Sequence, residues 1–363
     1  MYDLGKSKIR GFEALKERVI VSGFCNYCGT CAAFCNKLTL EEKIPELIGE
    51  CILKGSSSRC GINGLCYDNC PLAFILDAEY IFGEHGDELL GYYKYIKAAR
   101  ATADDTLEKA QDGGAVTTIL ISALESGKID GALVVDRDEM WNTLPRLVTS
   151  VEELRRSSGS KYTVCPNVYL LSKVLTTLDI RDVAIVGTPC QIQAVRNLQE
   201  GLFAQRSDDS EVRIYAIGLF CSGAFHYDKL LSHVPNMDIS KVKRMDFKKS
   251  NLAIHADETV TIPEEELEET MMESCRICPD YTSELADISI GSVGSPRGWS
   301  TVMVRSDIGD ELLKSSMELG HLEISDEIDL ERLRKLVDKK KEKAKSRIGT
   351  RKAKKLPLPP IYS

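Results

Sequence analysis

The chain has 363 residues, of which 43% are hydrophobic and 28% are charged, a balance typical of a globular protein in water. This length exceeds one ordinary core, so we expect two or more domains, and the net charge of -8 argues against nucleic-acid binding. No apolar run is long enough to cross a bilayer, and the charged first residues lack the apolar segment of a secretory signal. We therefore expect a cytoplasmic protein, free or peripheral to a membrane complex, whose 13 cysteines are ligands or redox groups rather than disulfides.

Composition divides the chain into five segments. A lead of residues 1–20 precedes residues 21–75, which contain eight of the 13 cysteines. Residues 76–94 form a helical-looking connector without cysteine, and residues 95–325 have the pattern of an α/β domain. Residues 326–363 end the chain with a charged helix and a basic tail. The sequence thus predicts a small cysteine-rich module followed by a larger α/β unit.

The first cysteine group has the spacing of a bacterial ferredoxin half-motif. Cys25, Cys28, Cys31 and Cys35 follow C-x2-C-x2-C-x3-C, although Asn36 stands where proline usually follows. Zinc sites favour separated C-x2-C pairs or mixed cysteine and histidine ligands, and no histidine precedes His85. The spacing therefore favours an iron–sulfur cluster over zinc.

The second group, CGINGLCYDNCP, matches the same motif at three of four positions, with Asn63 at the remaining one. In a two-cluster ferredoxin arrangement one cubane takes Cys25, Cys28, Cys31 and Cys70. The other takes Cys35, Cys60, Cys66 and a fourth ligand, for which we favour Cys51 because thiolates suit iron–sulfur irons best. The alternatives are Asn63, a three-iron cluster, and Cys51 as a buried free thiol.

From residue 95 onward, short β-branched apolar runs predict buried strands at residues 131–135, 182–187 and 213–220. Apolar residues at helical spacing predict helices at residues 115–128, 167–178 (after Pro166) and 188–201. Strands that alternate with helices favour an α/β sheet with a substantial parallel part. Residues 240–262 alternate more like antiparallel strands.

Four further cysteines are dispersed along this α/β region. Cys190 and Cys221 each follow a predicted strand, at the edge where open α/β sheets gather ligands, and Cys275 and Cys278 form a C-x2-C pair. Spacing alone leaves zinc, a redox pair or simple core positions open. Cys165 is expected to be a packing residue.

The C-terminal segment is strongly basic, with 12 lysines and arginines between Arg334 and Lys355 against two acidic residues. This pattern favours a solvated helix over residues 326–346 that frays into a tail, and the alternative is a docking arm for an acidic partner subunit. The closing LPLPPIYS has no helical pattern and is expected to be extended or disordered.

Taken together, these motifs resemble a known family. The matching segments are QDGGAVTTILISALESGKIDGALVV (111–135), SSGSKYTVCPN (157–167), VGTPCQIQAVR (186–196), GLFCSG (218–223), CRICPD (275–280) and ADISIGSVGSPRGWSTVMVRS (286–306). They are similar to the beta subunit of coenzyme F420-reducing hydrogenase and its relatives. These relatives include subunits of F420H2 dehydrogenase and formate dehydrogenase and the chlorophyll-pathway reductases of plants. The resemblance covers about residues 20 to 340.

The resemblance implies an α/β (α+β) flavoprotein domain preceded by a ferredoxin-like module with two 4Fe-4S clusters. It implies an F420-dependent oxidoreductase that transfers hydride between coenzyme F420 and FAD, then single electrons through 4Fe-4S clusters. A third 4Fe-4S cluster is implied at Cys190, Cys221, Cys275 and Cys278. The redox partner would be ferredoxin or a hydrogenase, heterodisulfide reductase, formate dehydrogenase or F420H2 dehydrogenase complex of the kind that serves methanogenesis.

Candidate cofactor residues lie in four loops. Two glycines before a helix let backbone N–H groups approach a phosphate or flavin edge, and hydroxyls and a lysine suit a pyrophosphate. With the positions that the resemblance adds, the candidates for FAD are Gly113, Gly114, Thr117, Thr118, Ser160, Lys161, Thr188, Gln191, Ser292 and Trp299. The implied relay needs no side-chain general acid, so Lys161 is only a candidate for steadying an anionic flavin. Ordinary turns and surface loops remain the alternative for each loop.

Two other functions keep the same fold. The chain could take electrons from ferredoxin and reduce another organic substrate. It could also be a non-catalytic subunit that holds only clusters, in which case it would bind no FAD.

Overall fold

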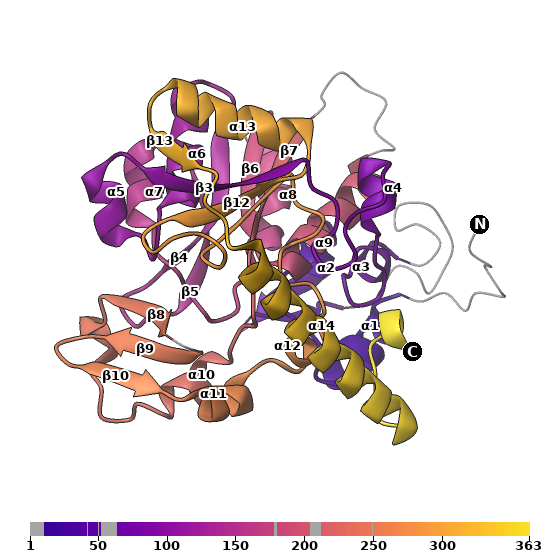
Figure 1. Ribbon diagram of the computed structural model, residues 1–363. Helices are drawn as coiled ribbons and strands as arrows, with labels where there is room; N and C mark the ends of the chain where they lie inside the picture. Colours follow the sequence, from indigo (N-terminus) through magenta and orange to yellow (C-terminus); the bar gives the residue numbers. More distant parts are fainter. Residues whose placement is uncertain are drawn as a thin grey trace.

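The structure is a computed structural model that describes residues 11–41, 43–49, 51, 64–177, 180–203, 212–248 and 250–363. Figure 1 shows a large sheet with helices on both sides, a smaller sheet below it, and a long C-terminal helix that crosses the front. The cysteine-rich N-terminal segment lies at the side of the large sheet, close to the C-terminus.

The large sheet contains eight strands and is mixed. Its strand order is β13 (Leu322–Ser325), β3 (Tyr95–Ala101), β12 (Ser300–Val304), β11 (Ile288–Gly291), β7 (Arg213–Leu219), β6 (Asp182–Gly187), β4 (Gly131–Arg137), β5 (Thr143–Val148). The four strands β4, β6, β7 and β11 are parallel, and the strands beyond them on both sides are antiparallel. The three predicted strands are confirmed within two residues, as is the predicted mixed α/β fold.

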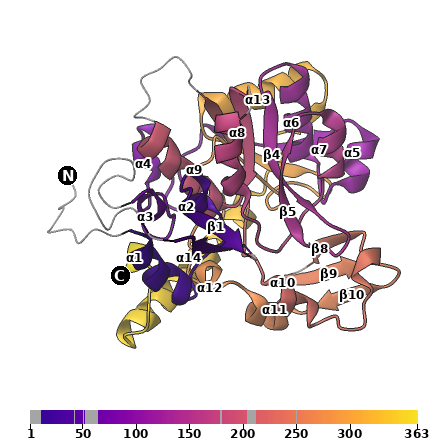
Figure 2. The same cartoon turned by 180° about the vertical axis from the view of Figure 1, so that it is seen from behind.

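Helices cover both faces of this sheet (Figures 1 and 2). One face packs on α6 (Ala115–Glu125), α7 (Val151–Arg156) and α13 (Asp307–Glu318), with α5 (Asp104–Lys109) at the edge. The other packs on η3 (Asn167–Leu170), α8 (Leu171–Thr177) and α9 (Pro189–Leu198), which η4 (Gln199–Phe203) extends. Alternate strand residues face opposite sides, so Ala184 joins the first core and Ile185 the second. The three predicted helices are present, and the one after Pro166 begins with a 3-10 turn.

The smaller sheet has its own core. Strands β8 (Arg244–Lys248), β9 (Asn251–His255) and β10 (Thr259–Ile262) are antiparallel, as predicted. They pack with α10 (Tyr227–Leu231), η5 (Ile239–Lys241) and α11 (Glu264–Thr270) around Phe225, Leu230 and Ile254. Trp141, from the large sheet's β4–β5 connection, is buried in this core and donates from Nε1 to the Val242 carbonyl at 2.9 Å. The span predicted as one unit therefore contains a second sheet with a core of its own.

The N-terminal segment is compact and short in regular structure. It contains α1 (Phe12–Leu15), η1 (Lys16–Val21), α2 (Thr30–Ala33), α3 (Leu65–Asp68) and a hairpin of β1 (Leu38–Glu41) and β2 (Ile44–Leu47). The Val168 N–H of η3 donates to the Cys28 carbonyl at 3.2 Å. This contact sets the cysteine-rich segment against the α8–α9 face of the large sheet, as Figure 2 also shows.

The connector, residues 76–94, is mostly not helical, contrary to the expectation. Helix α4 (Ala78–Phe82) ends at Gly83, which has a φ of +72° that suits glycine. The chain then turns back on itself, and the carboxylate of Asp87 accepts hydrogen bonds from the Leu89 and Leu90 N–H groups, each at 3.0 Å. The buried Arg305 side chain donates to the Leu90 carbonyl at 2.9 Å. Tertiary contacts thus outweigh the local helical pattern.

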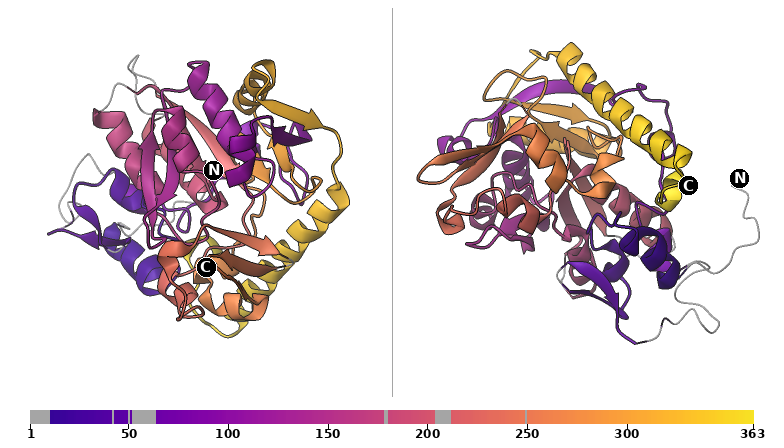
Figure 3. Two further views of the ribbon diagram at one scale, coloured as in Figure 1. Left: turned by 90° about the vertical axis from the view of Figure 1, so that its left-hand side faces the viewer. Right: turned by 90° about the horizontal axis from the view of Figure 1, so that it is seen from below.

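The C-terminal helix α14 (Leu330–Ala353) begins later and ends later than predicted. Figure 3 shows it running along the outside of the molecule toward the N-terminal segment. The tail after it is ordered rather than disordered, because it packs on that segment: the Ile361 N–H donates to the Leu72 carbonyl at 3.2 Å, and η6 (Pro360–Tyr362) adds a short turn. Among the described residues, no helix is long and apolar enough to span a bilayer.

Candidate functional site

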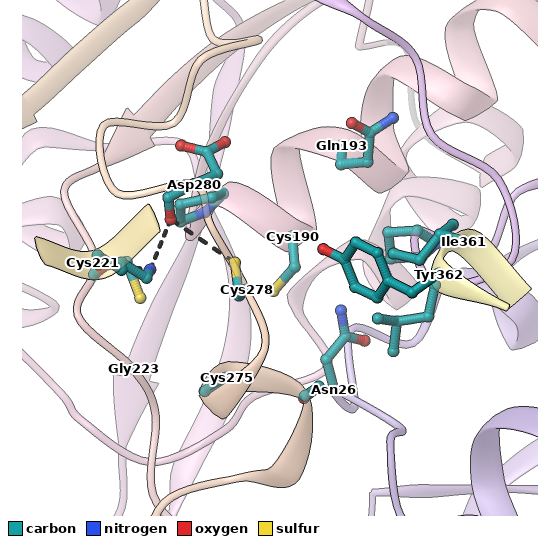
Figure 4. Close-up of a pocket in the computed structure, with 15 residues that line it drawn as sticks. Asn26, Cys190, Gln193, Cys221, Gly223, Cys275, Cys278, Asp280, Ile361 and Tyr362 are labelled. Atoms are coloured by element: carbon teal, nitrogen blue, oxygen red, sulfur yellow. Dashed lines mark hydrogen bonds between the residues drawn. The ribbon is translucent and has the colours of Figure 1, made fainter. Parts of the chain in front are cut away.

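Four cysteines from separate parts of the chain line one cavity (Figure 4). The cavity and its mouth enclose about 630 Å³. The cysteines come from the first turn of α9, the loop after β7, the helix α12 (Glu273–Arg276) and the loop after it: Cys190, Cys221, Cys275 and Cys278. The structure thus brings together the set that the resemblance assigns to a third cluster.

The start of α9 places Cys190. Thr188 caps the helix, Pro189 occupies its first turn, and the Gln191 side chain accepts a hydrogen bond from the Thr188 N–H at 2.9 Å. The Thr188 hydroxyl lies 3.3 Å from the Cys190 sulfur. Gln191 also donates to the Cys165 carbonyl at 2.8 Å. The polar groups of Thr188 and Gln191 therefore act in building the helix start, which gives them a structural role beside the flavin contact expected from sequence.

A buried ion pair holds α9 against the neighbouring strands. Arg196 Nη2 lies 2.9 Å from Asp287 Oδ1, and the two side chains are 9% and 3% exposed. Asp287 also accepts a hydrogen bond from the Ala216 N–H of β7 at 2.8 Å, and Arg196 Nε donates to the Leu285 carbonyl at 2.8 Å. The pair therefore fixes the helix that carries Cys190 relative to β7 and β11.

The other three cysteines are joined through backbone hydrogen bonds. The Cys221 N–H donates to the Tyr281 carbonyl at 2.8 Å, which ties the β7 loop to the segment after Cys278. The Ala224 N–H donates to the Cys275 sulfur at 3.3 Å. A backbone N–H donated to cysteine sulfur stabilises a thiolate, as a metal ligand requires.

The four thiols share a buried environment that raises the pKa of each of them. Burial raises the pKa of the Cys190 thiol well above its usual value, and the nearby Cys275, Cys278 and Cys221 raise it further. Burial and the adjacent Cys221 raise the pKa of Cys275 to about 12. Left alone, the thiols would stay protonated at neutral pH, whereas metal binding would release those protons.

The cavity also fits a group that accepts hydrogen bonds. Asn26 Nδ2 and Ser274 Oγ are buried, line the cavity, and have no partner among the described residues. Figure 4 shows the Asn26 side chain pointing into the cavity beside Tyr362. Within the same described ranges, no three His, Cys, Asp or Glu side chains converge closely enough to hold a single ion. A cubane takes one thiolate at each iron, so its ligands lie around a volume, and the four cysteines line one cavity.

A second cavity lies in the N-terminal segment and is lined by the other complete set, Cys25, Cys28, Cys31 and Cys70. Burial raises the pKa of the Cys31 thiol well above its usual value, and Cys25, Cys28 and Cys70 add to this effect. Asn26 lines both cavities, so the two candidate cluster sites share a wall.

Only part of the ligand set predicted for the other N-terminal cluster lies within the described residues. Cys35 and Cys66 pack in the same N-terminal core, and Cys51 is half-buried. Cys60 and the alternative ligand Asn63 lie outside the described residues. The fourth ligand of this site therefore stays a prediction.

The glycines expected at the flavin have a packing role in the structure. Gly113 lies between β3 and β12, where an added Cβ would be 2.4 Å from the Ala99 carbonyl oxygen and 2.5 Å from the Ser300 nitrogen. Gly114 caps α6 with a φ of +70°. Thr118 is buried and its hydroxyl donates to the Gly114 carbonyl at 3.0 Å, while Thr117 is half-buried.

We expect Gly113→Ala to destabilise the fold by about 1–3 kcal/mol or more, because neither backbone neighbour can move freely. Gly349→Ala is the matched control: it lies in α14 with open space around it and should be neutral or stabilise by up to about 1 kcal/mol. Thermal unfolding midpoints of both variants test this. Equal midpoints would show that the contact at Gly113 does not constrain the fold.

The other flavin candidates lie on loops near these glycines. Lys161 donates to the carbonyls of Ser157 and Ser158, and burial lowers its pKa to about 8. Ser160 and Trp299 are half-buried, and Ser292, which is exposed, hydrogen-bonds Asp112.

A polar cluster not anticipated from sequence lies between the two sheets. Tyr162 donates from its hydroxyl to Gln111 Oε1 at 2.7 Å, burial raises the pKa of Asp112, and Asp246 Oδ1 is buried with no partner in the described part of the chain. The DGG, SGSKY and GSVGS loops are therefore neighbours, although 50 to 180 residues separate them in sequence.

Comparison with known families decides the relationship. Residues 96–172 match the N-terminal model, and residues 180–329 the C-terminal model, of the coenzyme F420 hydrogenase/dehydrogenase beta subunit. The chain belongs to this family. The resemblance stated from the motifs is confirmed, and the two spans cover more than half of the chain.

Individual relatives of the F420 beta subunit family extend the match. The chain is 38% identical over 280 residues to coenzyme F420 hydrogenase subunit beta of Methanothermobacter thermautotrophicus, covering 75% of this chain and 99% of that protein. It is 33% identical over 351 residues to the coenzyme F420-dependent sulfite reductase of Methanocaldococcus jannaschii, covering 91% of this chain but 53% of that protein. A chain of the F420-reducing nickel–iron hydrogenase complex from Methanosarcina barkeri matches with a TM-score of 0.70 at 32% identity. The match covers 76% of this chain and 99% of that chain.

Helix α14 lies beyond the spans that match the F420 family models, which end at residue 329. Five of its basic side chains pair with acidic groups in other parts of this chain, as in the pairs Lys341–Glu284 (2.8 Å) and Arg351–Glu273 (2.6 Å). The charged run is therefore not a fully solvated helix, and a docking role for its exposed lysines stays a prediction.

Proposed function

We propose that this chain transfers electrons between coenzyme F420 and a partner protein through FAD and three 4Fe-4S clusters. Family membership supports the link to coenzyme F420, because relatives named for that coenzyme match at 33–38% identity. The observation that carries the cluster assignment is the cavity lined by Cys190, Cys221, Cys275 and Cys278. In this proposal, residues 21–75 hold two clusters and residues 95–325 hold FAD and the third.

The cofactors supply the chemistry: a flavin exchanges hydride with the deazaflavin, and iron–sulfur clusters exchange single electrons. The chain's own residues hold these groups and keep water away from them. The cavity of Cys190, Cys221, Cys275 and Cys278 is bounded by Leu72, Pro189 and Ile361, which limit solvent access. Asn26 Nδ2 and Ser274 Oγ are available as hydrogen-bond donors to a group in this cavity.

The shared wall at Asn26 supports an order for the proposed sites. The cavity of Cys25, Cys28, Cys31 and Cys70 adjoins the cavity that contains Cys190, so the cluster at Cys190 would lie between the flavin domain and the N-terminal pair of clusters. Cluster sites in a row that leads away from a flavin suit the delivery of electrons to another protein. The sulfite reductase relative is nearly twice as long as its matched part, which supports an electron-input role in a larger enzyme.

Lys161 gives the proposal a pH dependence. If its ammonium binds the FAD pyrophosphate, FAD affinity of the apoprotein should fall by up to about tenfold per pH unit above about pH 8, where burial places its pKa. Lys161→Arg should keep the affinity constant over the same range, because arginine stays charged. Isothermal titration of FAD from pH 7 to pH 10 measures both, and identical profiles would remove Lys161 from the flavin site.

Cofactor content tests the proposal directly. Anaerobically purified protein should contain roughly twelve iron atoms, as much sulfide, and one FAD. Protein with clusters but without FAD would instead be a pure electron-transfer subunit. Protein with FAD that is reduced by ferredoxin and not by reduced coenzyme F420 would be a reductase of another substrate.

A further inference from the structure

One lysine of α14 lies on the face of the helix that packs inward. Leu333, Val337 and Ala344 are buried, and Lys340 falls on the same stripe, three residues after Val337 and four before Ala344. An apolar side chain would be expected at this position. Lys340 is half-buried as a whole residue, and its ammonium is directed to polar partners inside the molecule.

The partners of Lys340 are backbone carbonyls beside the cavity of Cys190, Cys221, Cys275 and Cys278. Its Nζ donates to the Cys221 carbonyl and to the Asp280 carbonyl, each at 2.6 Å, and lies 5.9 Å from the centre of the Tyr281 ring. Lys340 also lines the cavity itself. Figure 4 shows the Asp280 carbonyl shared with Cys278, whose sulfur lies 3.7 Å from it. The ammonium is therefore anchored next to two of the four cysteines.

The two carbonyl oxygens accept hydrogen bonds from the charged form of this amine and so favour the ammonium, the ordinary form of lysine. An ammonium has three donors, and two are used by the carbonyls within the described residues, so one remains for a group in the cavity.

We propose that Lys340 is a positioned positive charge that raises the reduction potential of the cluster held by Cys190, Cys221, Cys275 and Cys278. The inference rests on the proposed function, because it requires a cluster in this cavity. Each one-electron reduction adds one negative charge to the cluster and moves no proton. A cation fixed beside the ligands stabilises the reduced state more than the oxidised one, most strongly where water is excluded. The Asp280 carboxylate, on the same segment, offsets part of this effect.

The alternative is that Lys340 has only a structural role, in which its hydrogen bonds to the Cys221 and Asp280 carbonyls hold their two loops together. Lys340→Gln keeps an N–H donor for the carbonyls and removes the charge, whereas Lys340→Met removes both. Lys339→Met is the control, since Lys339 is the neighbouring, exposed lysine of the same helix. Redox titration of anaerobic holoprotein, followed by EPR, measures each cluster's potential. The signal of the third cluster is identified by its loss in Cys278→Ala.

Lys340→Gln with its full iron content should shift that one signal to a more negative potential, and Lys339→Met should leave all potentials unchanged. Unchanged potentials in an iron-replete Lys340→Gln protein would overturn the inference, as would an equal shift in Lys339→Met. If Lys340→Met loses iron, the potential measured in Lys340→Gln alone decides whether the charge of Lys340 sets the cluster's potential. Wild-type protein without the cluster assigned to Cys278 would instead overturn the proposed function.

Discussion

Replacing Cys278 by alanine should remove or convert one cluster and stop electron flow beyond the flavin. The four cysteines line one cavity, and a cubane that loses one of its four thiolates is either lost or converted to a three-iron cluster. We expect loss of about one to four iron atoms and a fall in F420-linked reduction of any partner by more than about a hundredfold, since even outer-shell substitutions cost up to that much. FAD should be retained, because Cys278 itself is outside the four loops that carry the FAD candidates. Iron analysis, flavin extraction and steady-state rates measure these effects.

Cys165→Ala is the matched control for this experiment. Cys165 is also a buried cysteine of the α/β domain, close to Gln191, but it does not line the cavity. This variant should keep its full iron content. The assignment of the third site fails if Cys278→Ala keeps all its iron with an unchanged EPR spectrum.

Breaking the buried Arg196–Asp287 pair should have the largest effect on stability. Arg196→Met leaves Asp287 buried without its cation, which costs about 3–5 kcal/mol and lowers the unfolding midpoint by on the order of 10 °C. The loss should also loosen α9 and hence the position of Cys190. Calorimetry of the anaerobic holoprotein reports the midpoint.

Arg213→Met is the control, because Arg213 forms the same type of pair with Asp182 at 2.7 Å but is 66% exposed. An exposed pair contributes about 1 kcal/mol or less, so the midpoint should change little. Similar midpoints for the two variants would show that burial of the Arg196 pair does not matter to the fold.

The features that could be predicted from the sequence are those that depend on the spacing of residues within a short segment. The strand runs at residues 131–135 and 182–187, the helices that follow them, and the cysteine periodicities are all contained in short windows. The meeting of Cys190, Cys221 and the CRICPD pair required the family resemblance, because nothing local links segments up to 88 residues apart.

The residues that sequence reasoning missed depend on tertiary packing. Lys340 is hidden among 12 basic residues, and only its position on the stripe of Leu333, Val337 and Ala344 marks it as inward-facing. Asn26 follows a predicted ligand and has no pattern of its own. The prediction of a helical connector at residues 76–94 was wrong for the opposite reason. Its apolar residues do have helical spacing, but contacts of Asp87 and Arg305 impose turns.

Anaerobic mixing of the cofactor-replete protein with reduced coenzyme F420 tests the proposed electron transfer most directly. The absorbance of oxidised coenzyme F420 should appear while the iron–sulfur absorbance bleaches, with two electrons transferred for each coenzyme oxidised. In Cys278→Ala the flavin alone should be reduced. If the wild-type protein with FAD and all its clusters leaves reduced coenzyme F420 unchanged, the proposed function is contradicted.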